Sequence, residues 1–95
     1  MAGNKASISE KDFERIMKAF ANRRRLAILR FLKTEKEASV GDIAEEIKLS
    51  FKATSKHLGV LSAAGIVDRE QRSLQMFYRI SSDYPPPVHA VISIL

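Results

Sequence analysis

The sequence predicts a mainly α-helical domain with one small β-hairpin, in the order α-α-α-α-β-β-α, over residues 9–95 and after a flexible arm of residues 1–8. Three observations predict it. Apolar residues recur at helical spacing in four segments before Gly65, β-rich segments follow this glycine, and a last apolar helical stripe follows three consecutive prolines. A chain of 95 residues is long enough for one domain and too short for two.

Composition and charge narrow the class of protein. Hydrophobic residues make up 45% of the chain, and 16 Lys and Arg against 11 Asp and Glu give a net charge of +5. This excess of positive charge favours polyanionic partners, nucleic acid first among them. The absence of cysteine excludes disulfides, thiolate metal sites and thiol nucleophiles. Because no apolar run approaches the ~18 residues of a membrane span and no secretory signal opens the chain, we expect a soluble, cytoplasmic protein without a membrane partner.

The first two helices are indicated by the residues that would cap them. Ser9 and Asp12 fit a capping-box pattern and start a helix over residues 9–21. Asn22 can cap a second helix, which has a wide apolar face and is expected to be the most buried. The three arginines after Asn22 oppose the helix dipole, so they are either a solvated charge run or groups that face phosphate.

The third and fourth helices follow a polar link over residues 34–38. Ser39 and Asp42 repeat the capping-box pattern at the start of a short helix. Ser50 then caps a helix that runs to residue 64, where the following glycine is expected to adopt the left-handed conformation that ends many helices.

The rest of the chain predicts a hairpin and a final helix. β-Rich segments over residues 66–71 and 74–80 place Arg72 and Ser73 at the hairpin tip. This pair lacks the Gly or Asn that two-residue turns favour, so we expect a loose, mobile tip. A last helix is expected over residues 87–95. Two helices joined by a short turn, the second followed by a hairpin, describe a winged helix-turn-helix.

The fourth helix carries a polar face that the core does not need. With Lys52 at zero on a helical wheel, Lys56 lies at about 40° and Leu61 at about 180°. Ser55, at about 300°, lies on the Lys52 side. The segment from residue 50 to 64 holds no acidic residue, and a face of Lys, Ser and small residues suits a DNA groove lined by phosphates and base acceptors.

Four segments carry a resemblance to a known family. FANRRRLAILRFL (residues 20–32) is similar to LADPTRLRILRLL, and LSFKATSKHLGVL (residues 49–61) to LSQSTVSHHLKVL, while AGIV and FYRI are similar to AGLV and YYRL. Together they resemble the ArsR-type (arsenic-repressor-like) winged helix-turn-helix transcriptional regulators. The resemblance implies a homodimer held by the first and last helices. We therefore expect a repressor that binds double-stranded DNA, and two-fold pairing of the terminal helices would make its operator an inverted repeat. The DNA-binding residues that it implies are Phe51, Lys52, Ser55, Lys56 and, at the wing tip, Arg72.

Phe51 departs from the family, which often has a polar residue at this position. It lies at about 260° on the same wheel, at the border of the core face. Phe51 therefore either packs against Val40 or Leu58, or makes an apolar contact with a thymine methyl group.

The family's metal motif is also absent. Metal-sensing members carry two cysteines where this chain has Ser39 and Gly41, neither of which is a useful ligand for a soft metal. We therefore expect no metal and no cofactor, and no release of DNA by zinc, cadmium or arsenite. His89 is alone on the final helix and is not expected to bind a metal, and His57 is expected to be packed and hydrogen-bonded.

The terminal helices, over residues 9–21 and 87–95, predict the dimer interface. Both carry apolar stripes with little chain left to cover them, and exposed apolar stripes mark interfaces. The residues expected in the interface are Phe13, Ile16, Met17, Phe20, Val88, Val91, Ile92 and Leu95.

Two functions other than DNA binding are less favoured by the sequence. A winged helix can serve as a protein–protein interaction module, but the purely cationic face of the fourth helix argues against this use. An enzyme is not expected, because the sequence shows no Ser-His-Asp grouping, cysteine, metal cluster or glycine-rich phosphate loop.

Overall fold

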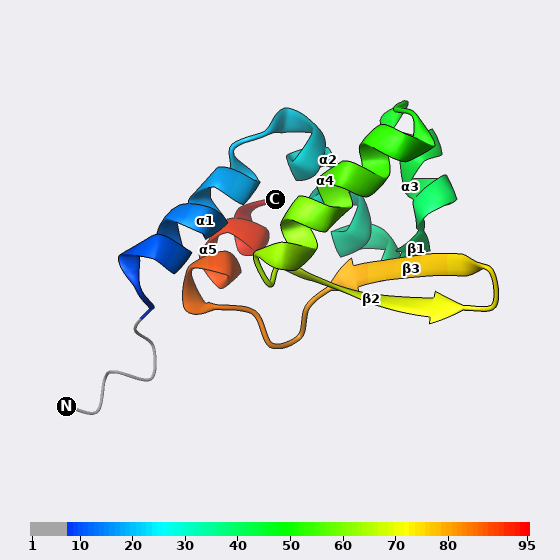
Figure 1. Ribbon diagram of the computed structural model, residues 1–95. Coiled ribbons are helices and arrows are strands. Elements are labelled where there is room, and N and C mark those ends of the chain that lie inside the picture. Colours follow the sequence, from blue (N-terminus) through cyan, green and yellow to red (C-terminus); the bar gives the residue numbers. More distant parts are fainter. Residues whose placement is uncertain (1–7) are drawn as a thin grey trace.

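The computed structural model describes residues 8–95 and confirms the predicted fold class, with helices and hairpin in the expected order (Figure 1). The predicted arm lies outside these residues except for Ile8, which is half-buried against the core and so belongs to the folded domain. Within the described residues, no helix is long and apolar enough to cross a membrane. The elements are α1 (Glu10–Phe20), α2 (Arg23–Glu35), β1 (Ala38–Ser39), α3 (Val40–Ile47), α4 (Phe51–Ala63), β2 (Val67–Arg72), β3 (Gln75–Ile80) and α5 (Pro86–Ile94).

The four predicted N-caps are confirmed. In each of α1 to α4, the side chain just before the helix accepts a hydrogen bond from a backbone N–H of the first turn. Such a bond satisfies a donor that has no partner inside the helix, which is why Ser and Asn are favoured there. The capping residues are Ser9, Asn22, Ser39 and Ser50.

The end of α4 is the predicted left-handed stop at Gly65. Gly65 has a φ of 76°, its N–H donates to the Ser62 carbonyl at 3.0 Å, and the Ile66 N–H donates to the Leu61 carbonyl at 3.0 Å. These are the two bonds of a Schellman motif. The motif turns the chain directly from α4 into β2, and so fixes the hairpin relative to the helix.

We expect Gly65→Ala to lower the free energy of unfolding by about 1–2 kcal/mol, because a Cβ is disfavoured in the left-handed region. The added Cβ would meet the Pro85 Cδ at 3.8 Å, an ordinary contact, so the backbone conformation and not lack of space is responsible. Gly59→Ala is the matched control. It adds a Cβ within α4 that meets nothing within 4 Å, and is expected to stabilise the protein by about 0.5–1 kcal/mol. Urea denaturation measures both; a neutral Gly65→Ala would contradict this role of the glycine.

The sheet has three strands in the order β1-β3-β2, so the predicted two-stranded hairpin was incomplete (Figure 1). The polar link is also shorter than the predicted residues 34–38, because α2 continues to Glu35 and β1 begins at Ala38. β1 pairs with β3 through Ala38 opposite Tyr78 and Ser39 opposite Phe77. A two-residue strand is too short to show an alternating pattern, and its partner lies far along the chain. β1 anchors the wing, defined here as β2, β3 and their turn, to the start of α3.

The turn of the wing lies one residue later than predicted. Arg72 pairs with Gln75 at the end of the ladder, so Ser73 and Leu74 form the tip and Arg72 does not. Ser73 adopts a positive φ of 56°, which allows a two-residue turn without Gly or Asn. The tip is therefore occupied by an apolar side chain, Leu74, which is 97% exposed.

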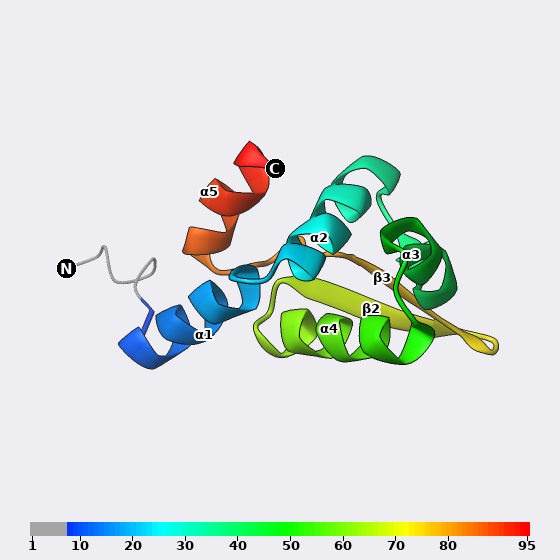
Figure 2. The ribbon, with the colours of Figure 1, turned by 90° about the horizontal axis from the view of Figure 1, so that it is seen from above.

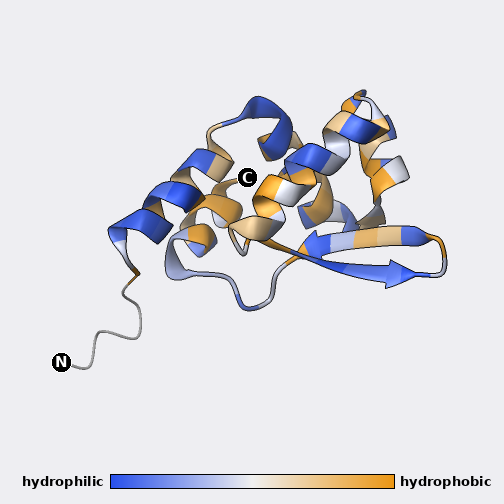
Figure 3. Cartoon of the chain, in the orientation of Figure 1, coloured by the Kyte–Doolittle hydropathy of each residue, from blue (hydrophilic) through white to orange (hydrophobic). Residues whose placement is uncertain are grey.

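The apolar stripes of the terminal helices are largely used inside the chain, which corrects the predicted dimer interface. Ile16, Phe20, Val88 and Ile92 are buried in the core, because α5 packs against both α1 and α2. These four residues are therefore not on a free surface. Figure 3 shows that α5 and parts of α4 are built from apolar residues, coloured orange, whereas much of α1 and β2 is hydrophilic and coloured blue.

Candidate nucleic-acid interface

The two faces of α4 are separated as its sequence predicts. Leu58 and Leu61 are fully buried, whereas Lys52 and Lys56 are exposed, and Ser55 is half-buried beside them. Lys52 and Lys56 are one helical turn apart, so their ammonium groups belong to one stripe of the surface. Core packing therefore buries one side of α4 and leaves the other side free. We call the surface formed by Lys52, Ser55 and Lys56 on this free side the cationic stripe.

Phe51 is not packed as expected from its place beside the core face. It is 63% exposed, so burial against Val40 or Leu58 is wrong. Its side chain lines a small cleft of about 120 Å³ between the start of α4 and the wing, together with Val40 and Leu74. Phe51 thus extends the free surface of α4 by an aromatic ring.

The three arginines at the start of α2 include two that bind the ends of other helices. Arg25 donates to the Ala19 and Lys18 carbonyls at 2.7 and 3.1 Å, which lie at the end of α1. Arg24 donates to the Ile47 carbonyl at 3.3 Å, at the end of α3. Cations are favourable at helix C-termini, where carbonyls lack partners. Arg25 is half-buried and so is not part of a solvated charge run, whereas Arg23 and Arg24 are exposed, as that alternative predicts. Contact of these arginines with phosphate stays a prediction.

Arg25 also contacts α4 through His57. The Arg25 Nη1 donates to the His57 Nδ1 at 3.1 Å, so the histidine proton belongs on Nε2. Burial, and then the charges of Arg25 and Arg24, lower the pKa of His57 below its usual value, which keeps the ring neutral and able to accept at pH 7. The predicted packed, hydrogen-bonded histidine is confirmed. It ties α4 to the end of α1, a connection that sequence spacing could not reveal.

Arg72 is held by acidic side chains. Its guanidinium donates to both carboxylate oxygens of Glu37, at 2.5 and 2.9 Å, and to Glu70 at 3.1 Å. It also lies over the Phe77 ring, 4.6 Å from the centroid. These bonds lower the pKa of both Glu37 and Glu70 below the usual value. Arg72 is exposed, and Glu37 and Glu70 would compete with a phosphate for its guanidinium.

The positions that match the family's cysteines have other roles. Ser39 is buried, and its hydroxyl caps α3 by accepting from the Asp42 N–H at 3.2 Å. Gly41 is exposed in the first turn of that helix. The part of the chain that the structure describes holds no group of three His, Cys, Asp or Glu side chains that could bind a metal ion. His89 instead contacts the Tyr84 hydroxyl at 3.1 Å.

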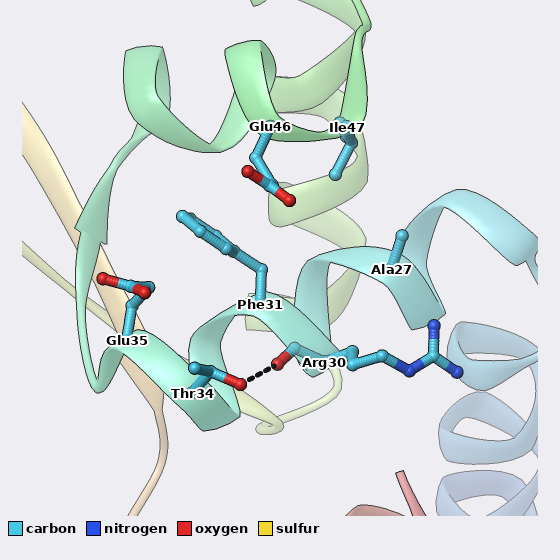
Figure 4. A pocket seen from close by; sticks show the side chains of 7 residues that line it. All are labelled: Ala27, Arg30, Phe31, Thr34, Glu35, Glu46 and Ile47. Atoms are coloured by element: carbon cyan, nitrogen blue, oxygen red, sulfur yellow. Dashed lines mark hydrogen bonds between the residues drawn. The ribbon is translucent and has the colours of Figure 1, made fainter.

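A hollow between α2 and α3 is separate from the residues predicted to bind DNA (Figure 4). The Phe31 ring points into it, with Glu35 and Glu46 at its edges. None of the residues predicted to bind DNA lines this hollow, and its lining holds two carboxylates, Glu35 and Glu46, against one cation, Arg30. The cationic stripe of α4 is therefore the better candidate for a nucleic-acid contact.

Comparisons with known proteins agree with this geometry. A family model described as a helix-turn-helix domain matches residues 20–70. The transcriptional activator HlyU of Vibrio cholerae is 39% identical over 80 residues, which cover 84% of this chain and 70% of HlyU. The biofilm growth-associated repressor of Agrobacterium fabrum is 35% identical over 68 residues, which cover 72% of this chain and 57% of the repressor.

A solved structure extends the likeness to the whole fold. It is the homodimeric winged helix-turn-helix DNA-binding domain of a Mycobacterium bovis protein described as a possible ArsR-family transcriptional regulator. The match has a TM-score of 0.76 and 29% identity, and covers 99% of this chain and 89% of that one.

Proposed function

Because the chain belongs to the ArsR-type family of winged helix-turn-helix, DNA-binding transcriptional regulators, we propose that it is a homodimeric repressor that binds an inverted-repeat operator and acts in the cytoplasm. The main support for a contact with the operator is the cationic stripe, which lies on α4 opposite the side that is buried in the core. The residues proposed to contact DNA are Phe51, Lys52, Ser55, Lys56 and Arg72.

The proposed mechanism uses α4 as the recognition helix. Its Lys side chains and Ser55 would reach phosphates and base acceptors in the major groove, and the free N–H groups of its first turn favour phosphate. The bonds of Arg25 to α1 and to His57 would hold α4 at a fixed angle to the end of α1. Repression follows where such a dimer occupies DNA that the transcription machinery needs.

The proposed dimer uses the apolar residues of α1 and α5 that remain outside the core. Phe13 is 45% exposed, and Ile94, which the sequence analysis missed, is 82% exposed. Met17, Val91 and Leu95 are only half-buried in the single chain. Figure 2 shows α1 and α5 together at one end of the molecule, opposite the wing. A second copy covering this end would leave both α4 helices free for DNA.

Two features support the proposal that this regulator does not use the family's cysteine metal site. No cysteine is present, and Ser39 is occupied as the cap of α3. Of the two relatives named above, one is an activator and one a repressor. A promoter fused to a reporter gene, with the selected operator inside it, separates these activities: expression that falls when the protein is supplied supports repression, and expression that rises contradicts it.

Selection from a random double-stranded DNA library tests the proposed function. We expect the purified protein to enrich an inverted repeat whose half-sites lie ~34–36 Å apart, about one helical turn. Affinity for this operator should fall steeply with salt, because each neutralised phosphate releases counterions. Enrichment of no sequence, with only salt-dependent binding to any DNA, would contradict an operator-specific regulator.

We expect Arg72→Ala to weaken binding to operator and unrelated DNA alike, and to lower the slope of log affinity against log salt by about one. Glu37→Gln should raise affinity, because the amide has no negative charge and only one acceptor oxygen, and so competes less strongly with phosphate for Arg72. Glu46→Gln is the charge-matched control on α3, outside this ion-pair cluster. In the Arg72→Ala background, Glu37→Gln should raise affinity no more than Glu46→Gln does in the same background. Fluorescence anisotropy at several salt concentrations measures the three single variants and the two double variants. An unchanged slope in Arg72→Ala would remove Arg72 from the DNA contact.

A further inference from the structure

Two of the most exposed large apolar side chains lie on either side of one cleft. Leu74, at the wing tip, is 97% exposed, and Phe51, the first residue of α4, is 63% exposed. The cleft between them encloses about 120 Å³, and Val40 and Met76 also line it. We call this feature the wing cleft.

The position of the wing cleft connects it with the cationic stripe. Phe51 directly precedes Lys52, and Ser55 lies one turn after Phe51 on the same side of α4. Any DNA that lies along the stripe therefore meets the apolar ring at the start of the helix. A phenylalanine ring has no positive charge and no hydrogen-bond donor, so it adds nothing to the binding of phosphates or base acceptors.

One apolar group is available on the bases in the major groove: the 5-methyl group of thymine. It is small enough for a cleft of this volume, and its contact with Phe51 and Leu74 would remove apolar surface of both partners from water. The continuity of the cleft with the cationic stripe favours DNA over a protein as the occupant, because a protein partner would have to sit against Lys52 as well.

We propose that Phe51 and Leu74 form an apolar specificity element that reads one thymine methyl group in each half-site of the operator. The proposal rests on the proposed function, since it needs a specific operator. Phe51 supplies the main contact from the helix, and Leu74 closes the cleft from the wing. The element discriminates thymine from cytosine at one position, which the lysines cannot do through phosphates.

The experiment removes only the methyl group. In the operator selected by the unaltered protein, each thymine is replaced in turn by deoxyuridine, and affinity is measured by fluorescence anisotropy. We expect one position in each half-site where the replacement lowers affinity about fourfold, the ratio given by the burial of one methyl-sized group. All other replacements should change affinity less than twofold.

Variants connect the methyl effect with the wing cleft. In Phe51→Ala, binding should be weaker and the sensitive deoxyuridine position should become neutral; Leu74→Ala should reduce the sensitivity in part. Val60→Ala is the control, since Val60 is an exposed apolar residue of α4 that does not line the cleft. It should keep the full methyl effect.

Failure of this inference differs from failure of the proposed function. If the unaltered protein binds its selected operator but no thymine is sensitive to loss of its methyl group, the specificity element is wrong while the regulator stands. The same holds if Phe51→Ala and Leu74→Ala leave operator affinity unchanged, because the cleft would then make no contact with the operator. If no operator is enriched at all, the proposed function fails first.

Discussion

Lys56→Glu is expected to abolish specific operator binding and to leave the fold intact. Lys56 is exposed on the cationic stripe of α4, so its replacement disturbs no core contact. Loss of a base contact alone weakens binding by about 1–3 kcal/mol. The new carboxylate would also be repelled by the DNA phosphates, and a dimer carries one such carboxylate in each subunit. Electrophoretic mobility shift with the selected operator measures the loss, and circular dichroism with a melting curve checks the fold.

Lys11→Glu is the matched control for this variant. Lys11 is exposed on α1, outside the stripe, and the substitution changes the net charge by the same amount. It should weaken binding only through the smaller total charge, equally on operator and unrelated DNA. If Lys56→Glu binds the operator as well as the unaltered protein does, α4 does not present this face to the groove.

The double variant Phe13→Glu with Ile94→Glu is expected to convert the dimer into monomers and to weaken operator binding by about 10²-fold or more. Both side chains are exposed in the single chain, so charges there leave the core unaltered. Burying four carboxylates in a two-fold interface is strongly unfavourable. The monomer would also lose the gain of binding two linked half-sites, which reaches about 10²–10⁴-fold.

Sedimentation velocity and binding to a single half-site test this double variant together. The unaltered protein should sediment as a dimer and the variant as a monomer, with similar affinity for one isolated half-site. Substitution is preferable to removal of α5, because Val88 and Ile92 are buried and their loss would expose the core. A concentration-independent monomer of the unaltered chain that still binds the operator tightly would overturn the dimer.

Local signals in the sequence determined the order of elements and the face of α4. The caps at Ser9, Asn22, Ser39 and Ser50 and the left-handed stop at Gly65 are each decided by residues within one or two turns. The division of α4 into an apolar and a cationic face follows from helical periodicity alone, and it places Lys52, Ser55 and Lys56 on the free side. For this reason these features could be predicted without a structure.

Only the tertiary structure decided which side chains meet across the chain. Helical spacing shows that α1 and α5 have apolar stripes. It does not show that α1 packs against α5 within one chain, so that Ile16 and Val88 are buried while Phe13 stays exposed. Two further contacts join segments that are more than thirty residues apart: the pairing of β1 with β3, and the ion pair between Glu37 and Arg72. Periodicity and capping record only neighbours within a few residues, whereas burial and ion pairing depend on which distant surface packing brings near.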